Sequence, residues 1–142
     1  MRLIASRRYA HLEDGQLRSV SRKNSVHALR CTRWRFDSVV RRSYRRLPGF
    51  VRHLLTNVVL VVEDAPPTGY IVQGTALGTY QGTPLGERGS GYTMVLPDKI
   101  TIYRRPLIEA CSSVRELKGE IELTMLHELG HYFGLDDHEL PF

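Results

Sequence analysis

The segment HELGHYFGLDDH, residues 127–138, has the residue types and spacing of a metal site. His127 and His131 are four residues apart, so a helix would place both imidazoles on one face, with their Cβ atoms roughly 5–6 Å apart. Zinc binds imidazole nitrogen at about 2.0–2.1 Å, and a catalytic zinc site keeps three protein ligands and a water. In an H-E-x-x-H arrangement the glutamate, here Glu128, is the general base toward the metal-bound water. The segment therefore predicts metal-assisted hydrolysis.

Few residues follow the second histidine, so we expect the third ligand to be Asp136, Asp137 or His138, or a residue upstream. Gly134 lets the chain leave the helix in a left-handed conformation and turn back toward the metal. In the metzincin-type spacing H-E-x-x-H-x-x-G-x-x-[H/D], the third ligand lies ten residues after the first, which is Asp137. His138 is one residue later, where an extended segment turns its side chain away, and it is kept as the alternative ligand.

The histidines need a helix with a well-defined start, face and end. Ser113 and Glu116 have the S-x-x-E spacing of a capping box, and Gly134 is a natural stop, which predicts a helix over 114–133. An i+4 row on this helix can face a core: Leu117, Ile121, Met125 and Leu129. The two histidines point away from that row, so the helix is predicted to bury one side and to offer ligands on the other.

The preceding chain predicts one amphipathic helix and several strands. Residues 35–46 have apolar spacing of a helix with exposed arginines, ended by Leu-Pro-Gly at 47–49, and 50–55 is read as one more helical turn. Strands are predicted over 57–64, 76–82, 92–97 and 99–104, the last two around a tight turn at Pro97–Asp98, and a short helix over 107–111. This order of a helix, strands and a long C-terminal helix indicates an α+β fold.

Charge divides the chain into two parts. The length of 142 residues suits a single domain, and the formal net charge is +5. Residues 1–52 contain 14 Lys and Arg against 3 Asp and Glu, whereas residues 53–142 contain 6 against 12. We therefore predict a basic, loosely ordered N-terminal arm over 1–33 and a folded domain over 34–142 that carries the metal site.

The composition also excludes a membrane protein. No apolar run approaches the roughly 20 residues that a membrane span requires. The first residues lack the apolar stretch of a signal peptide, so we expect a cytoplasmic protein with no membrane partner. Cys31 and Cys111 do not form a CxxC pair, and we expect two reduced thiols.

Two stretches, GTYQGTPLGERGSGYTMVLPDKITIYRRPL and TMLHELGHYFGLDDHEL, resemble the small bacterial zincin-like metallopeptidases. These are single-domain proteins, common in actinobacteria, that end in HExxHxxGxxD. The resemblance runs from about Phe36 to Phe142. It implies a compact zincin fold with a small mixed β-sheet, an active-site helix and no methionine turn. It also implies zinc held by His127, His131 and Asp137, with Glu128 as the base.

The leading functional hypothesis is a zinc-dependent metallopeptidase that acts on a peptide or protein substrate. The alternative is a non-hydrolytic, metal-stabilised binding module whose basic arm contacts nucleic acid or a protein partner. Arg88 is read either as a ligand for a substrate carboxylate or as a solvated loop residue. Tyr92, Tyr103 and Tyr132 are read either as donors to an oxyanion or as residues packed in or beside the core.

Overall fold

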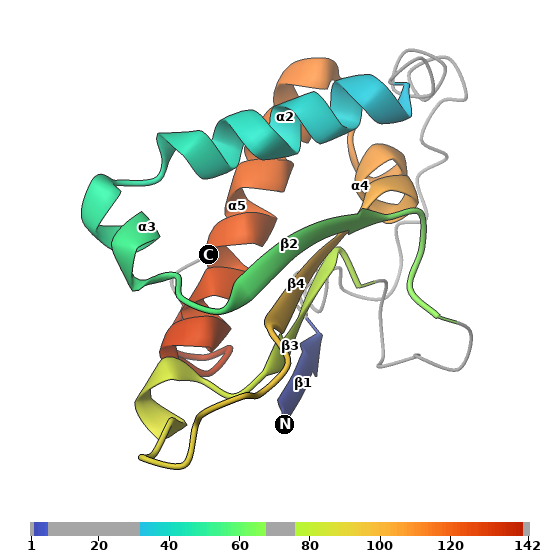
Figure 1. Ribbon diagram of the computed structural model, residues 1–142. Helices are drawn as coiled ribbons and strands as arrows, with labels where there is room; N and C mark the ends of the chain where they lie inside the picture. Colours follow the sequence, from blue (N-terminus) through green and yellow to red (C-terminus); the bar gives the residue numbers. More distant parts are fainter. Residues whose placement is uncertain (1, 6–31, 68–75, 141–142) are drawn as a thin grey trace.

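The structure, a computed structural model, describes residues 2–5, 32–67 and 76–140 (Figure 1). Four strands form one mixed sheet in the order β1-β3-β4-β2. The strands are β1 (Arg2–Ala5), β2 (Val58–Glu63), β3 (Gly78–Gly82) and β4 (Asp98–Tyr103). β3 runs antiparallel to both β1 and β4, whereas β2 and β4 are parallel. The sheet and its helices confirm the predicted α+β fold with a small mixed sheet.

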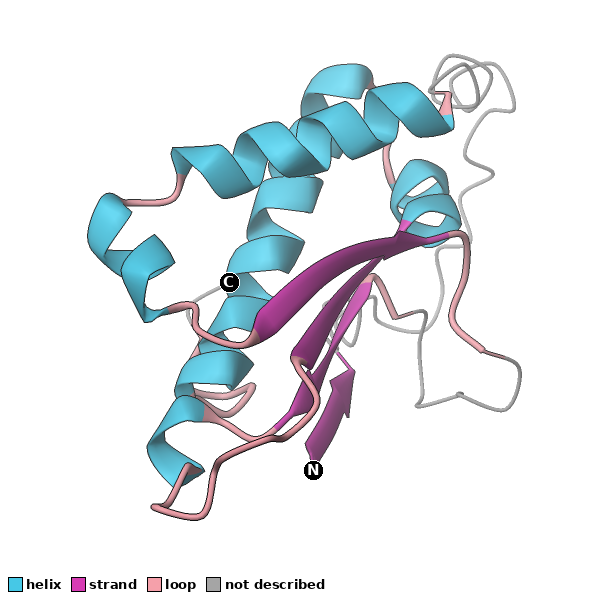
Figure 2. Ribbon diagram, viewed as in Figure 1, coloured by secondary structure: helices cyan, strands magenta, loops and turns pink. Residues whose placement is uncertain are grey.

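The longest helix, near the end of the chain, packs directly on the sheet, and other helices pack on that helix (Figure 2). They are α2 (Arg33–Arg46), α3 (Gly49–Leu54), the 3-10 helix η1 (Leu85–Glu87), α4 (Arg104–Ala110) and α5 (Val114–Phe133). α5 packs against β3 and β4, and α2 packs against α5. The core between these elements includes Phe36 and Val40 of α2, Tyr80 of β3, and Ile100 and Ile102 of β4. It is closed by the predicted row of α5, in which Leu117, Ile121, Met125 and Leu129 are all buried.

Local signals set both ends of α5. The side-chain oxygen of Ser113 accepts a hydrogen bond from the backbone N–H of Glu116 at 3.1 Å. The Glu116 carboxylate accepts one from the N–H of Ser112 at 2.7 Å, one residue before the position expected for a capping box. Gly134 ends the helix with a φ of 96°, in the left-handed region. The helix therefore has the predicted bounds.

The prediction for residues 92–104 is wrong in part. Only one strand is present, because residues 92–97 form no strand and β4 begins at Asp98. The apolar residues that suggested a buried strand are exposed, with Met94 and Leu96 almost fully accessible to solvent. The side chain of Asn57 contacts the carbonyl oxygens of Val95 and Leu96 at 3.4 and 3.5 Å, and so holds this segment in an irregular path. α4 begins at Arg104, three residues before the predicted start of the short helix.

A strand that the sequence did not predict lies at the start of the chain. β1 pairs with β3, with Arg2 opposite Gly82 and Ala5 opposite Thr79. It lies within residues 1–33, for which a loosely ordered arm was expected. Residues 6–31 of that arm are outside the described residues, and so is Cys31. Cys111 is buried and free, and burial raises the pKa of its thiol to about 12.

A buried ion pair joins the segment before β4 to the sheet. Arg88 donates to Asp98 at 2.7 Å, and the two side chains are 8% and 3% exposed. The Asp98 carboxylate also accepts hydrogen bonds from Tyr80 at 2.6 Å and from Tyr92 at 3.1 Å. Arg88 is thus neither a solvated residue nor a free ligand for substrate, and both readings of it from the sequence are wrong.

Arg88 also reaches the last turn of α5. Its guanidinium donates to the hydroxyl of Tyr132 at 3.3 Å and stacks over the rings of Tyr92 and Tyr132 at 4.5 and 4.8 Å. The Tyr132 hydroxyl itself donates to the carbonyl oxygen of Leu54 at 2.8 Å. Tyr103 is buried, with its hydroxyl 3.2 Å from that of Thr79. All three tyrosines therefore have partners within the fold. No helix among the described residues is long and apolar enough to cross a membrane.

Candidate metal centre

The last two turns of α5 hold two buried histidines on one face. His127 and His131 are 3% and 0% exposed, and their ring centroids lie 4.7 Å apart. After the left-handed turn at Gly134, the N–H of Leu135 donates to the carbonyl oxygen of Gly130 at 3.0 Å. The returning chain packs so closely on the helix that a Cβ at position 130 would collide with Leu140. This turn directs the following residues back toward the histidines.

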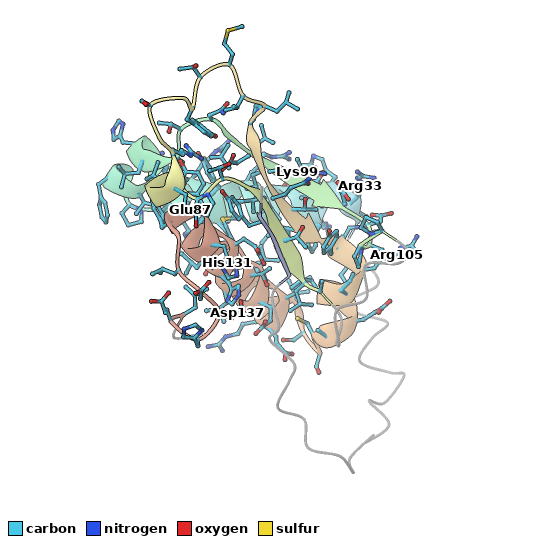
Figure 3. All side chains as sticks on the ribbon, turned by 90° about the horizontal axis from the view of Figure 1, so that it is seen from below. Arg33, Glu87, Lys99, Arg105, His131 and Asp137 are labelled. Atoms are coloured by element: carbon cyan, nitrogen blue, oxygen red, sulfur yellow. The ribbon has the colours of Figure 1, made fainter. Side chains whose placement is uncertain are left out.

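Asp137 meets both histidines at one point. Its Oδ1 atom lies 3.1 Å from Nε2 of His127 and 3.1 Å from Nε2 of His131. The three side chains offer ligand atoms that all lie within 4.8 Å of one another. Figure 3 shows His131 and Asp137 close together. His138, the alternative ligand, is exposed and is not part of this group.

The ring of His131 is oriented for metal binding by its second nitrogen. Nδ1 lies 2.9 Å from the carbonyl oxygen of Leu135, so Nδ1 carries the proton and donates. Nε2 then keeps its lone pair, which is the form that binds a metal. Burial lowers the pKa of His131, which favours this neutral form. Among the residues described, the buried Nε2 atom makes no well-formed hydrogen bond, although Oδ1 of Asp137 lies 3.1 Å away.

Glu128 lies beside the group in a fully buried position. Neither carboxylate oxygen makes a well-formed hydrogen bond within the described part of the chain, and a backbone interaction with Tyr80 stabilises the charged form only in part. Burial raises the pKa of Glu128 well above its ordinary value, and the negative charge of Asp137 adds to the rise. A carboxyl group that is fully buried with so little compensation is costly for folding, which points to a functional reason for its presence.

Space for Glu128 comes from a glycine that the sequence did not indicate as part of the site. A Cβ at Gly78 of β3 would lie 2.9 Å from Oε1 of Glu128 and 2.8 Å from Cγ2 of Thr124. Real Cβ contacts are longer, so only glycine allows α5 to approach β3 this closely. No spacing rule connects residue 78 with residue 128, and the relation is visible only in the folded chain.

Substituting Gly78 by Ala should lower the free energy of unfolding by about 1–3 kcal/mol, the usual cost of overpacking. Urea unfolding of the metal-free protein measures this change. Gly86→Ala is the matched control, because a Cβ there meets nothing within 4 Å, and its effect should stay within about 0.5 kcal/mol. An unchanged unfolding midpoint for Gly78→Ala would show that β3 and α5 are not in close contact at this point.

The donor set fits a divalent transition metal. Two imidazole nitrogens and one carboxylate oxygen are a combination that zinc accepts, and three protein ligands leave one coordination position open. His127 and His131 are buried, whereas Asp137 is partly exposed, with 38% of its side chain accessible. An ion held here would be bound by two buried histidines and reached from solvent on the side of Asp137. It would lie next to Glu128, whose pKa is raised by burial.

Comparison with known families gives a match that covers this group of residues. The family described as zincin-like metallopeptidase matches residues 55–141, which is more than half of the chain. The chain therefore belongs to the zincin-like metallopeptidase family. The matched span includes β2, β3, β4, α4 and α5 but not α2, so it begins later than the resemblance seen in the sequence.

One solved structure is similar in outline. It is a conserved hypothetical protein from Thermus thermophilus, 22% identical, with a TM-score of 0.49. The similarity covers 68% of this chain and 89% of that one. No curated protein matches the chain.

Proposed function

We propose that this chain is a zinc-dependent metallopeptidase, with zinc held by His127, His131 and Asp137 and with Glu128 as general base. The observation that carries the proposal is the convergence of two Nε2 atoms on one Oδ1 atom, each at 3.1 Å. A fully buried carboxyl group, whose pKa is raised by that burial, stands beside them. Membership of a metallopeptidase family supports the same reaction class.

A zinc ion in this position would polarise the carbonyl group of a peptide bond and lower the pKa of water. The chain's own residues supply the proton transfers. Glu128 takes one proton from the attacking water as the C–O bond forms, and gives it to the amine nitrogen as the C–N bond breaks. A carboxyl group whose pKa is raised by burial is suited to hold that proton between the two steps.

The neutral state of His131 is also needed for metal binding. The carbonyl oxygen of Leu135 fixes its tautomer, and a protonated imidazole could not serve as a ligand. We therefore expect hydrolysis to fall at acid pH, where protonation of the ligand histidines releases the metal. Asp137 adds negative charge to the ligand set, which lowers the net charge of the centre compared with one built from three imidazoles.

Digestion of a peptide library, followed by mass spectrometry, tests the proposal. The zinc-loaded full chain should cleave library peptides, a strong chelator should abolish cleavage, and restored zinc should recover it. The alternative, a non-hydrolytic metal-stabilised binding module, predicts that zinc binds and no peptide is released. Cleavage that continues unchanged in chelator would contradict both functions.

A further inference from the structure

α2 has a second face beside the one that packs on α5, with two exposed arginines and a half-buried tyrosine. Phe36, Val40 and Ser43 form the buried face of the helix. Arg41, Tyr44 and Arg45 are three and four residues apart, so they share a different face, one turn long. This second face lines a cavity of about 380 Å³.

The rest of the cavity is apolar. Val58 and Leu60 of β2 and Ile100 of β4 lie on the sheet side, and Met125 and Leu129 lie on α5. Figure 1 shows α2 crossing over this region, with β2 and α5 below it. Cavities of roughly 300–1,000 Å³ with mainly apolar walls and a few polar groups are the usual form of small-molecule sites.

The cavity is separate from the metal centre. Met125 and Leu129 each stand two residues before a histidine of the centre, and residues two apart on a helix point in roughly opposite directions. The body of α5 therefore lies between the cavity and the imidazoles of His127 and His131. Occupation of one does not require the other.

Two arginines line the cavity from its exposed side. Within the described ranges, Arg41 and Arg45 form no ion pair, whereas the neighbouring Arg46 pairs with Glu122 at 3.3 Å. Tyr44, on the same face, is half-buried and adds a hydroxyl group to the lining. Residues 33–54 contain seven arginines and one acidic residue, so the potential around the cavity is strongly positive.

We propose that this cavity binds an amphipathic carboxylate of the medium-chain fatty acid class. The apolar tail lies on the side chains of β2 and α5, and the carboxylate lies between Arg41 and Arg45 with the Tyr44 hydroxyl as a further donor. Arginine matches a carboxylate in charge and geometry. An inorganic anion would leave the apolar walls in water, and a cationic amphiphile would meet the two arginines with like charge.

Calorimetric titration of the full chain with decanoate tests this site. We expect saturable binding of one decanoate per chain, and no comparable binding of acetate or decylamine. Arg41→Ala and Arg45→Ala should each weaken binding about tenfold, the value of one charge-assisted hydrogen bond. Arg42→Ala is the matched control, since Arg42 is exposed on the same helix and does not line the cavity, and it should leave the affinity unchanged.

A pair of valines in β2 tests the location. Val58→Phe fills the cavity and should abolish binding, whereas Val59→Phe, on the other face of the strand and 43% exposed, should not. If Val58→Phe fails to fold, Leu55→Phe at the loop wall of the cavity takes its place. Absence of saturable binding, equal affinity for decylamine, equal loss in Arg42→Ala, or full binding by a folded cavity-filling variant would each overturn the proposal.

Discussion

Replacing Glu128 by Gln is expected to lower hydrolysis by roughly 10²–10⁴-fold, the usual contribution of a general base, and to leave the metal ligands in place. Gln has nearly the same shape as Glu but accepts no proton at neutral pH. The same substitution should raise the stability of the metal-free protein at pH 7, because a fully buried amide stays neutral, whereas the buried carboxyl group must either ionise or hold its proton at a pH above its ordinary pKa. The rate is measured by peptide cleavage and the stability by urea unfolding.

The pH dependence of this gain has a definite sign. Burial raises the pKa of Glu128 in the folded protein above its ordinary value of 4.5. A group with a raised folded pKa favours folding most below its unfolded pKa, and this contribution is lost as the pH rises through the folded pKa. The stability gain of Glu128→Gln in metal-free protein should therefore be largest at neutral and alkaline pH, and should shrink as the pH falls toward 4.5.

Glu122→Gln is the control, because it makes the same chemical change on the same helix at a half-exposed carboxylate paired with Arg46. It should leave hydrolysis unchanged. If Glu128→Gln cleaves peptides at the wild-type rate, Glu128 is not the base. If it also destabilises the metal-free protein at pH 7, the account of its buried carboxyl group is wrong.

Arg88→Ala should lower the free energy of unfolding by roughly 3–5 kcal/mol, because removing one member of a buried ion pair leaves the other charge buried and uncompensated. The charge left behind is the carboxylate of Asp98, which is 3% exposed. The substitution also removes the contacts of the guanidinium with the rings of Tyr92 and Tyr132. Urea unfolding followed by circular dichroism measures the loss.

Two comparisons show whether burial is the cause. Arg46→Ala breaks an ion pair whose side chains are 71% and 43% exposed, and it should cost no more than about 1 kcal/mol. In a double-mutant cycle, Arg88→Ala with Asp98→Ala should cost clearly less than the sum of the two single changes, because neither charge is then left alone. Additive losses, or a loss for Arg88→Ala as small as that for Arg46→Ala, would contradict a coupled buried pair.

Features encoded by neighbouring residues were predictable from the sequence. The bounds of α5 follow from Ser113, Glu116 and Gly134, which act within one turn of the helix ends. The histidine pair and Glu128 follow from helical spacing in the same way. Asp137 was predicted from the spacing of the motif, ten residues after His127, and the structure brings it close to both histidines.

Features that depend on distant partners were not predictable. β1 exists as a strand because it pairs with β3, more than seventy residues later in the chain, and its own four residues carry no strong strand signal. Residues 92–97 have the composition of a strand, but the contacts of Asn57 with Val95 and Leu96 hold them in a loop. The burial of Arg88 likewise depends on Asp98, which the sequence suggested only as a turn residue.

Zinc affinity, measured by competition with a chromophoric chelator, shows whether His127, His131 and Asp137 together hold a metal ion. The wild-type chain should bind one zinc ion. The zinc affinity of Asp137→Ala should fall by more than roughly 10–100-fold, which is the usual effect of changing a residue that only supports the ligands. His138→Ala, at the exposed neighbouring residue, should bind zinc like the wild type. Wild-type affinity in Asp137→Ala, or a large loss in His138→Ala instead, would contradict a centre formed by His127, His131 and Asp137.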